Sequence, residues 1–178
     1  YGVAFTTSGA TQTVTVTAKT TDTAIDLSSL VGSASSATSV AASTFSVDAG
    51  ANASSIAITG MAAAKNTIEG SATSGDVLTG GGKADTFVVD SDALLFDASN
   101  VMQDTYVGGA GTDTLKLNAT ASAVTVVAAD DFSKASTMES ITTAGNTGAI
   151  SLTLGATAET AGFTKIDLSG DDEATGAN

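Results

Sequence analysis

The chain has 178 residues, and its 19 acidic residues face only six lysines, with no arginine and no histidine, for a net charge of −13. This balance excludes a nucleic-acid-binding protein, because phosphate contacts depend on Lys and Arg. Cysteine is absent, which excludes disulfides and thiolate metal sites. The acidity either keeps the chain soluble or reflects folding with bound cations.

The composition favours thin β-layers. Hydrophobic residues make up 42% of the chain, but aromatic residues are limited to six Phe and two Tyr, and Pro is absent. Abundant Thr and Val favour strands, and frequent Gly favours turns. We expect an all-β protein of one domain or two small ones. No segment has the length and apolarity of a membrane span. Cysteine-free chains rich in Ser and Thr are typical of bacterial surface proteins, so we expect an extracellular location at the bacterial cell surface.

Residues 1–60 alternate in the manner of β-strands. In "TVTVT" (13–17), Val14 and Val16 share one face, while the threonines lie on the other. Further short strands are expected over 23–27, 43–48 and 54–60, with a loop over 32–42.

From Asn66 onward, glycines and regularly spaced aspartates appear. Asp76 and Asp85 are nine residues apart, as are Asp104 and Asp113. An apolar residue follows each aspartate at the second position, namely Leu78, Phe87, Tyr106 and Leu115. Such a period indicates stacked repeats. However, Asp85 and Asp104 are 19 residues apart, so the segment 88–103 must contain an insertion. That insertion holds three further candidate ligands, Asp90, Asp92 and Asp97.

The rest of the chain also reads as β-structure. Strands are expected over 121–128, 138–143, 149–154 and 163–168. Helical character is limited to one or two turns within 92–102, apart from the stretch 61–65. We divide the chain into a strand-rich segment, 1–65, and a repeat-bearing segment, 66–178, with one continuous solenoid as the alternative. The chain starts at Tyr1 and ends in "SGDDEATGAN", and we expect it to be a piece of a longer protein.

The segment "GGAGTDTLK" (108–116) matches the pattern G-G-x-G-x-D-x-U-x, where U is apolar. A second copy, "GGGKADTFV" (80–88), has Lys83 in place of the third motif glycine. Glycine lets a short loop turn back and direct its carbonyls inward. Calcium takes about six to eight oxygen ligands, which carbonyls and aspartates can supply. Without His or Cys, zinc is a poor alternative, and magnesium prefers a more hydrated site. A Gly- and Asp-rich turn that binds nothing remains the simpler alternative.

At these residues the sequence resembles the RTX (hemolysin-type) calcium-binding proteins, above all over 66–117. The resemblance implies a short, irregular parallel β-roll, or β-solenoid, that binds calcium between stacked loops and is flanked by further strands. Lys83 brings a positive charge close to one of the implied sites. The implied ligands are the carboxylates of Asp76, Asp85, Asp104 and Asp113 and the carbonyls of Gly80, Gly82, Gly108, Ala110 and Gly111.

The resemblance leaves the biological role open, because the repeat occurs in toxins, proteases, lipases, adhesins and surface-layer proteins. The Thr/Ala/Ser/Gly-rich remainder looks most like a bacterial S-layer protein of the RTX type, which implies calcium-dependent self-assembly into a lattice. Regions outside this chain could then attach it to a cell-surface polysaccharide. Export by a type I exporter is implied by the family alone. A segment of an RTX adhesin is the first alternative, and an ice-binding solenoid with a Thr13, Thr15 and Thr17 face is a remote one.

An enzyme is not expected within these residues. Without His or Cys, Ser–His–Asp and Cys–His arrangements are excluded. Without Arg, phosphoryl and carboxylate substrates lose their usual clamp. A glycosidase needs only two carboxylates, but the absence of Trp and the presence of only two Tyr leave no obvious sugar platform.

Overall fold

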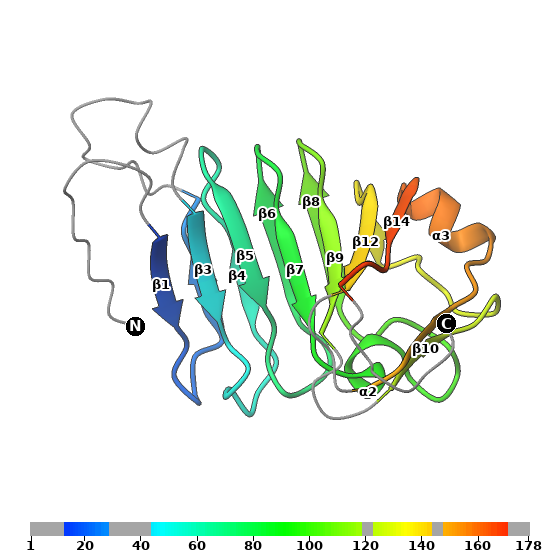
Figure 1. The fold of residues 1–178 in the computed structure, drawn as a ribbon. Coiled ribbons are helices and arrows are strands. Elements are labelled where there is room, and N and C mark those ends of the chain that lie inside the picture. The colour runs from blue at the N-terminus through cyan, green and yellow to red at the C-terminus, as the bar shows by residue number, and fades with distance from the viewer. Residues whose placement is uncertain (1–12, 29–43, 119–122, 144–147, 171–178) are drawn as a thin grey trace.

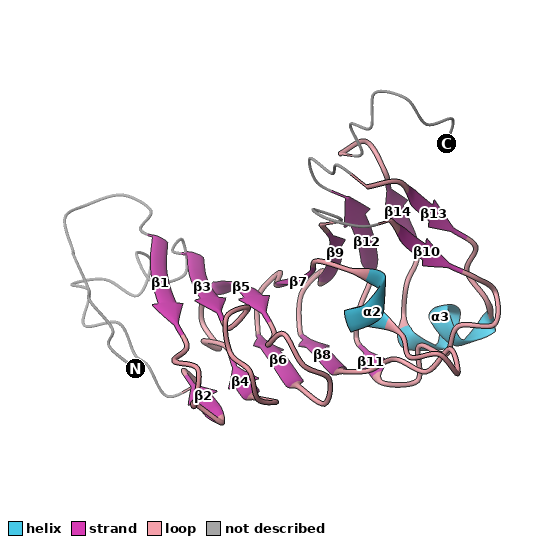
Figure 2. Ribbon diagram, turned by 90° about the horizontal axis from the view of Figure 1, so that it is seen from below, coloured by secondary structure: helices cyan, strands magenta, loops and turns pink. Residues whose placement is uncertain are grey.

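The computed structural model describes residues 13–28, 44–118, 123–143 and 148–170, and these residues are mostly β-strand (Figure 1). Every pairing between named strands is parallel. The predicted all-β class is therefore confirmed. Two larger sheets, sheet A and sheet B, face one another as layers (Figure 2), and a separate pair of strands lies beside them.

The strands follow one another in a regular spatial order within each sheet. Sheet A contains β1 (Thr13–Thr17), β3 (Thr44–Asp48), β5 (Lys65–Glu69), β7 (Thr86–Val89), β9 (Thr114–Leu117), β12 (Ser140–Thr143) and β14 (Lys165–Asp167). Sheet B contains β2 (Ala24–Asp26), β4 (Ala57–Thr59), β6 (Val77–Gly81), β8 (Thr105–Gly109) and β11 (Ala135–Ser136). The separate pair is β10 (Val124–Val126) and β13 (Ile150–Leu152), and the helices are α2 (Asp92–Leu95) and α3 (Ala156–Ala161).

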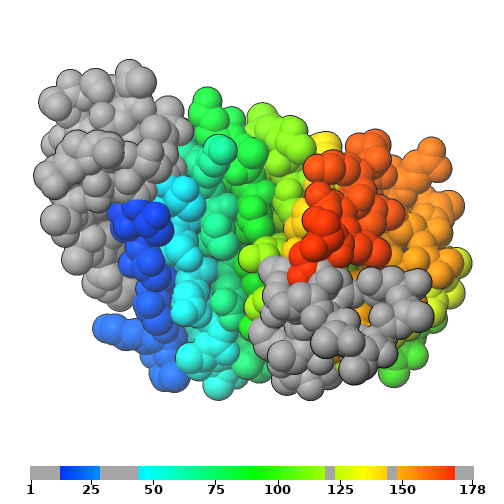
Figure 3. Space-filling model, viewed as in Figure 1, coloured from blue at the N-terminus to red at the C-terminus, as the bar shows by residue number. Residues whose placement is uncertain are grey.

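From β1 to β9 the chain changes sheet after every strand, so odd-numbered strands build sheet A and even-numbered strands build sheet B. The colours of the space-filling view therefore run in chain order from blue to yellow-green along this part of the molecule (Figure 3). The parallel register aligns equivalent side chains. One buried row of sheet A consists of Val16, Val47, Ile68, Phe87, Leu115 and Ile141. A facing row of sheet B consists of Ile25, Ile58, Leu78, Tyr106 and Ala135.

The predicted strands form at all eight expected places within the described residues, although most are shorter than expected. In β1 the two valines are buried and the three threonines are exposed, as the alternation predicts. The predicted loop over 32–42 lies outside the described residues. The expected division at 65/66 falls at the first two residues of β5, and β5 pairs with β3 on one side and β7 on the other.

One expectation about helices is wrong. The stretch 61–65, which the sequence leaves open to a helix, forms a turn that leads into β5. Conversely, α3 arises in "ATAETA", where no helix was expected. Alanine has the highest helix propensity, and Ala158 and Ala161 are buried against the core. Gly162 ends the helix with a φ of 110°, a left-handed conformation that favours glycine.

The expected insertion lies between β7 and β8 and contains α2, which confirms the short helical stretch. Its apolar residues Leu95, Phe96 and Met102 are buried. The Phe96 ring packs edge-on against Phe132, with ring centres 5.1 Å apart. The insertion therefore extends the core. The described helices, of four and six residues, are too short to cross a membrane.

We predict that Phe87→Ala destabilises the fold strongly. Phe87 is fully buried and packs edge-on against Tyr106 at a ring-centre distance of 5.8 Å. Truncating a buried Phe costs about 3–5 kcal/mol, which chemical denaturation would measure. Thr86→Ala is the matched control, because Thr86 is partly exposed on the outer face of the same strand. A surface substitution of this kind costs within about 0.5 kcal/mol. Equal losses for the two variants would contradict the assigned faces.

Candidate functional site

Six polar residues occupy equivalent positions, each two residues before a buried apolar residue of a strand. The sheet A ladder consists of Asn66, Asp85, Asp113 and Glu139. The sheet B ladder consists of Asp76 and Asp104. All except Glu139 are buried, and Asp113 is completely inaccessible. The parallel register places each member beside the next one in the neighbouring strand, at the usual spacing of about 4.8 Å.

The carboxylates of the sheet A ladder accept main-chain N–H groups in contacts that all run in one direction. The main-chain N–H of Asn66 donates to Asp85 Oδ1 at 2.7 Å, and that of Asp85 donates to Asp113 Oδ1 at 2.8 Å. The N–H of Asp113 then donates to Glu139 Oε2 at 2.7 Å. Each carboxylate thus accepts the amide of the residue one strand earlier. A buried amide left without an acceptor would cost about 1–3 kcal/mol, so these contacts stabilise the stack.

Asp85 and Asp113 differ in their second carboxylate oxygen. Asp85 Oδ2 accepts the N–H of Gly81, in its own loop, at 2.6 Å. The equivalent amide in the next loop, that of Gly109, donates instead to Thr137 Oγ1 at 2.8 Å. Asp113 Oδ2 is consequently buried with no hydrogen-bond partner. A buried carboxylate oxygen without a partner is costly, so this atom marks the place where the protein alone leaves a negative charge uncompensated.

The sheet B ladder repeats the same arrangement at the opposite end of β6. Asp76 Oδ1 accepts the N–H of Ile56 at 2.8 Å, and Asp104 Oδ1 accepts the N–H of Asp76 at 2.9 Å. Asp76 is further held by Ser71, whose N–H donates to Oδ2 at 2.5 Å and whose hydroxyl donates to Oδ1 at 2.9 Å. The hydroxyl of Tyr106 is 3.5 Å from Asp104 Oδ2, a weak contact. These two aspartates are better satisfied than Asp113.

The environment raises the pKa of several ladder carboxylates. Burial raises the pKa of Asp104 to about 6, and the nearby charge of Asp76 acts in the same direction. Burial also raises the pKa of Asp85 and of Asp113, against the hydrogen bonds that favour ionisation. The charges of Asp85 and Glu139 also raise the pKa of Asp113. The ladders therefore concentrate negative charge that a cation would compensate.

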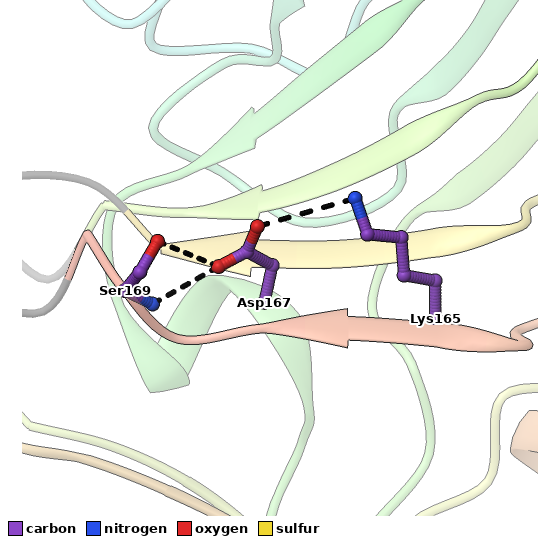
Figure 4. Close-up of polar contacts among 3 residues, drawn as sticks. All are labelled: Lys165, Asp167 and Ser169. Carbon is purple, nitrogen blue, oxygen red and sulfur yellow. Dashed lines mark hydrogen bonds and ion pairs between the residues drawn. The ribbon is translucent and has the colours of Figure 1, made fainter.

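The lysines do not supply that compensation. Lys83 is exposed, although it belongs to the loop before Asp85. Within the described residues, one ion pair is present, between Lys165 and Asp167 of β14, and it lies at the surface (Figure 4). Its atoms are 4.0 Å apart, and Asp167 Oδ1 also accepts the N–H and hydroxyl of Ser169 at 3.1 Å and 2.6 Å. The Lys165 side chain is thus paired with Asp167 and not with a ladder carboxylate.

The residues predicted as ligands fall into separate groups. Asp85 and Asp113 are neighbours, and Gly80 and Gly108 are buried beside them in β6 and β8. The structure does not bring Asp76 and Asp104 to this group, because they precede β6 and β8 whereas Asp85 and Asp113 follow them. The remaining predicted positions, Gly82, Ala110 and Gly111, are exposed in the loops.

The two motif glycines in the strands are required by close packing. A Cβ on Gly80 would overlap the Asp85 carboxylate and the carbonyl of Gly108. A Cβ on Gly108 would overlap the carbonyl of Thr137 and lie 2.6 Å from Asp113 Oδ2. Among the described residues, no cluster of three or more acidic side chains forms a metal site by itself. A cation held here would therefore depend largely on main-chain carbonyls.

The three aspartates of the insertion accept hydrogen bonds, Asp97 from its own turn and Asp90 and Asp92 from later segments of the chain. Asp97 Oδ1 accepts the N–H groups of Ser99 and Val101. Asp90 Oδ1 accepts from the side chain of Asn118, and Asp92 Oδ1 accepts the N–H of Thr125 at 3.2 Å. They stabilise turns and contacts around the insertion.

The glycine motif missed two members of the sheet A ladder, Asn66 and Glu139. Neither belongs to a G-G-x-G-x-D segment, and Glu139 is 26 residues after Asp113 rather than 18. A simpler signal would have found both, since each is followed at the second position by a buried isoleucine, Ile68 or Ile141. The polar-x-apolar pattern is the feature that all ladder residues share.

Comparisons with protein-family models, curated proteins and solved structures find no match to this chain.

A second acidic group lies where strands of sheet A end, whereas the sheet A ladder lies where they begin. Asp48 and Glu69 are paired in register, and a Cβ on Gly50 would overlap Glu69 Oε1. Burial raises the pKa of Glu69 to about 7, and the charges of Asp90 and Asp48 and a hydrogen bond with Asp90 add to the effect. Glu69 also lines a small cavity of about 80 Å³.

We predict that Glu69 makes the protein less stable as the pH rises. Its folded-state pKa of about 7 is above the ordinary 4.5, so the folded state binds the extra proton between these values. The loss of stability caused by ionising Glu69 in the folded protein is absent below about pH 4.5 and complete above about pH 7. Glu69→Gln should raise the free energy of unfolding at pH 8 by on the order of 1 kcal/mol, allowing for solvent screening of a half-buried group.

The experiment is a set of denaturation curves in calcium-free buffer at pH 4, 6 and 8. The exposed Glu159→Gln on α3 removes the same charge and is the control. A difference between Glu69→Gln and wild type that is independent of pH would contradict the assignment.

Proposed function

We propose that this chain is a calcium-dependent structural module of a secreted bacterial surface protein, which self-assembles into an S-layer lattice. In this proposal its alternating parallel strands form a short β-roll of the RTX type. Calcium binding is supported above all by Asp113 Oδ2. This oxygen is buried without a hydrogen-bond partner, in a loop with the full G-G-x-G-x-D pattern.

The donor set around this oxygen suits a hard cation. It consists of carboxylates and main-chain carbonyls, the oxygen ligands that calcium prefers. The chain offers no imidazole or thiolate for a softer metal. Asp85 and Asp113 would supply the charge, and carbonyls of the 80–85 and 108–113 loops would supply further oxygens. The sheet B ladder, Asp76 and Asp104, is a second candidate, but each of its carboxylates has more donors than that of Asp113.

A structural role fits the remaining chemistry better than catalysis. The chain lacks His, Cys and Arg, and the ladder carboxylates are engaged with main-chain amides. Stacked strands contact mainly their neighbours, so one bound ion would stabilise adjoining strands and the order would extend along the stack. The lattice itself rests on the resemblance of the composition to S-layer proteins.

The ice-binding alternative is weakened by the outer face of sheet A. The threonines of β1 are exposed. In the neighbouring strands, however, charged residues occupy two of the three rows that these threonines begin. Lys65 occupies the row of Thr13, and Asp48 and Glu69 occupy the row of Thr17. A continuous Thr-x-Thr face therefore does not form.

We predict that calcium stabilises the folded chain and that Asp113→Asn abolishes most of this effect. At about 100 times the dissociation constant, one site adds about 2.7 kcal/mol, or roughly 5–10 °C in Tm for a chain of this size. Thermal unfolding with calcium and then with excess EGTA would measure it. Asp97→Asn, in an exposed turn, is the control and should respond like wild type. Unchanged melting on EGTA addition would refute calcium dependence.

We also predict that calcium promotes self-association. Analytical ultracentrifugation and negative-stain imaging should show ordered assemblies with calcium and dispersed chains after EGTA. Chains that bind calcium but stay monomeric would contradict the lattice. Binding of those monomers to a glycan-coated surface would favour the adhesin alternative.

A further inference from the structure

The turn Ser136–Glu139 contains no glycine, yet it lies directly against the motif loop 108–113. We propose that Thr137 and Glu139 of this turn provide the second half of the ligand shell for the cation held by Asp113. This inference rests on the proposed calcium binding and extends it to a turn that no calcium motif marks.

Thr137 already has the backbone conformation of a loop that presents its carbonyl. Its φ is 53°, in the left-handed region that a threonine seldom adopts. Its carbonyl and Asp113 Oδ2 approach the same point from different chain segments, because a Cβ on Gly108 would overlap the first and lie 2.6 Å from the second. The absence of a side chain on Gly108 thus lets these two oxygens approach each other closely.

The Thr137 hydroxyl explains why Asp113 Oδ2 is available. In the preceding loop, the amide of Gly81 donates to the carboxylate of Asp85. Here Thr137 Oγ1 accepts the equivalent amide, that of Gly109, at 2.8 Å. Asp113 Oδ2 therefore keeps its lone pairs for another partner. This completely buried, unpartnered oxygen is an observation independent of the acidic residues around it.

Glu139 occupies the next position of the sheet A ladder. Its Oε2 accepts the N–H of Asp113 at 2.7 Å. In return, the N–H groups of Glu139 and Ser140 both donate to the carbonyl of Asp113 at 3.0 Å. The two residues are thus fixed against each other. A second carboxylate beside Asp113 adds negative charge, which favours a hard divalent cation over a monovalent one.

Calcium titration of the full chain by isothermal calorimetry tests the proposal. Glu139→Gln should weaken the calcium affinity of the Asp113 site by about 10-fold or more, as losses around metal ligands do. Glu159→Gln removes the same charge from the exposed face of α3 and should bind like wild type. Circular dichroism without calcium would verify that each variant is folded.

A second pair of variants separates metal binding from folding. Thr137→Ser keeps the hydroxyl that accepts from Gly109, so this conservative variant should retain most of the calcium affinity. Thr137→Ala removes it, so that the Gly109 amide is released toward Asp113 Oδ2, and affinity should fall several-fold. This pair decides the matter if Glu139→Gln does not fold.

The outcomes distinguish the two proposals. Wild-type chain that takes up no calcium refutes the proposed function and the inference with it. Wild-type chain that binds calcium, with Glu139→Gln equal to Glu159→Gln and Thr137→Ala equal to Thr137→Ser, overturns the role of this turn alone. A selective loss in either test variant supports it.

Discussion

The structure depends on one repeated interaction, in which a main-chain N–H at the start of a strand donates to the carboxylate at the equivalent position of the next strand in the same sheet. Buried amides at these positions would otherwise have no acceptor, since the chain is turning between sheets. The carboxylates of Asp85, Asp113 and Glu139 each accept the N–H of the equivalent residue one strand earlier. In sheet B, Asp76 and Asp104 do the same for Ile56 and Asp76, so each of these amides relies on the next strand of its sheet.

The use of carboxylates as acceptors for these main-chain N–H groups has an electrostatic consequence. A carboxylate is a stronger acceptor than a neutral side chain, but each one brings a charge into the layer between the sheets. The sheet A ladder begins with a neutral residue, Asn66, and continues with three acidic ones. Repulsion therefore accumulates along the stack, and the raised pKa of Asp113 reflects burial first and then the charges of Asp85 and Glu139. Oxygen-rich surroundings and excess negative charge together favour a divalent cation.

Sequence reasoning predicted the part of this arrangement that depends on local periodicity. The alternation in "TVTVT" predicts which side chains of β1 are buried, and the two copies of the glycine motif give Asp85 and Asp113 the same place in the motif, which the parallel register of β7 and β9 matches. Sequence reasoning could not predict the partners of those residues, because the contact between Asp113 and Glu139 depends on the length of the connection between β9 and β12. The helix α3 was missed for a related reason, since its two buried alanines are too small to give a clear apolar stripe.

The comparison of Asp85 with Asp113 shows why a motif alone does not define a site. Both aspartates follow a pair of glycines, and both are buried. They differ because the amide that satisfies Asp85 within its own loop is, in the next loop, accepted by Thr137 from another strand connection. The availability of Asp113 Oδ2 is thus decided by a residue 24 positions later in the chain. In a stack of this kind, the chemistry of each loop is set by the loop that packs on it.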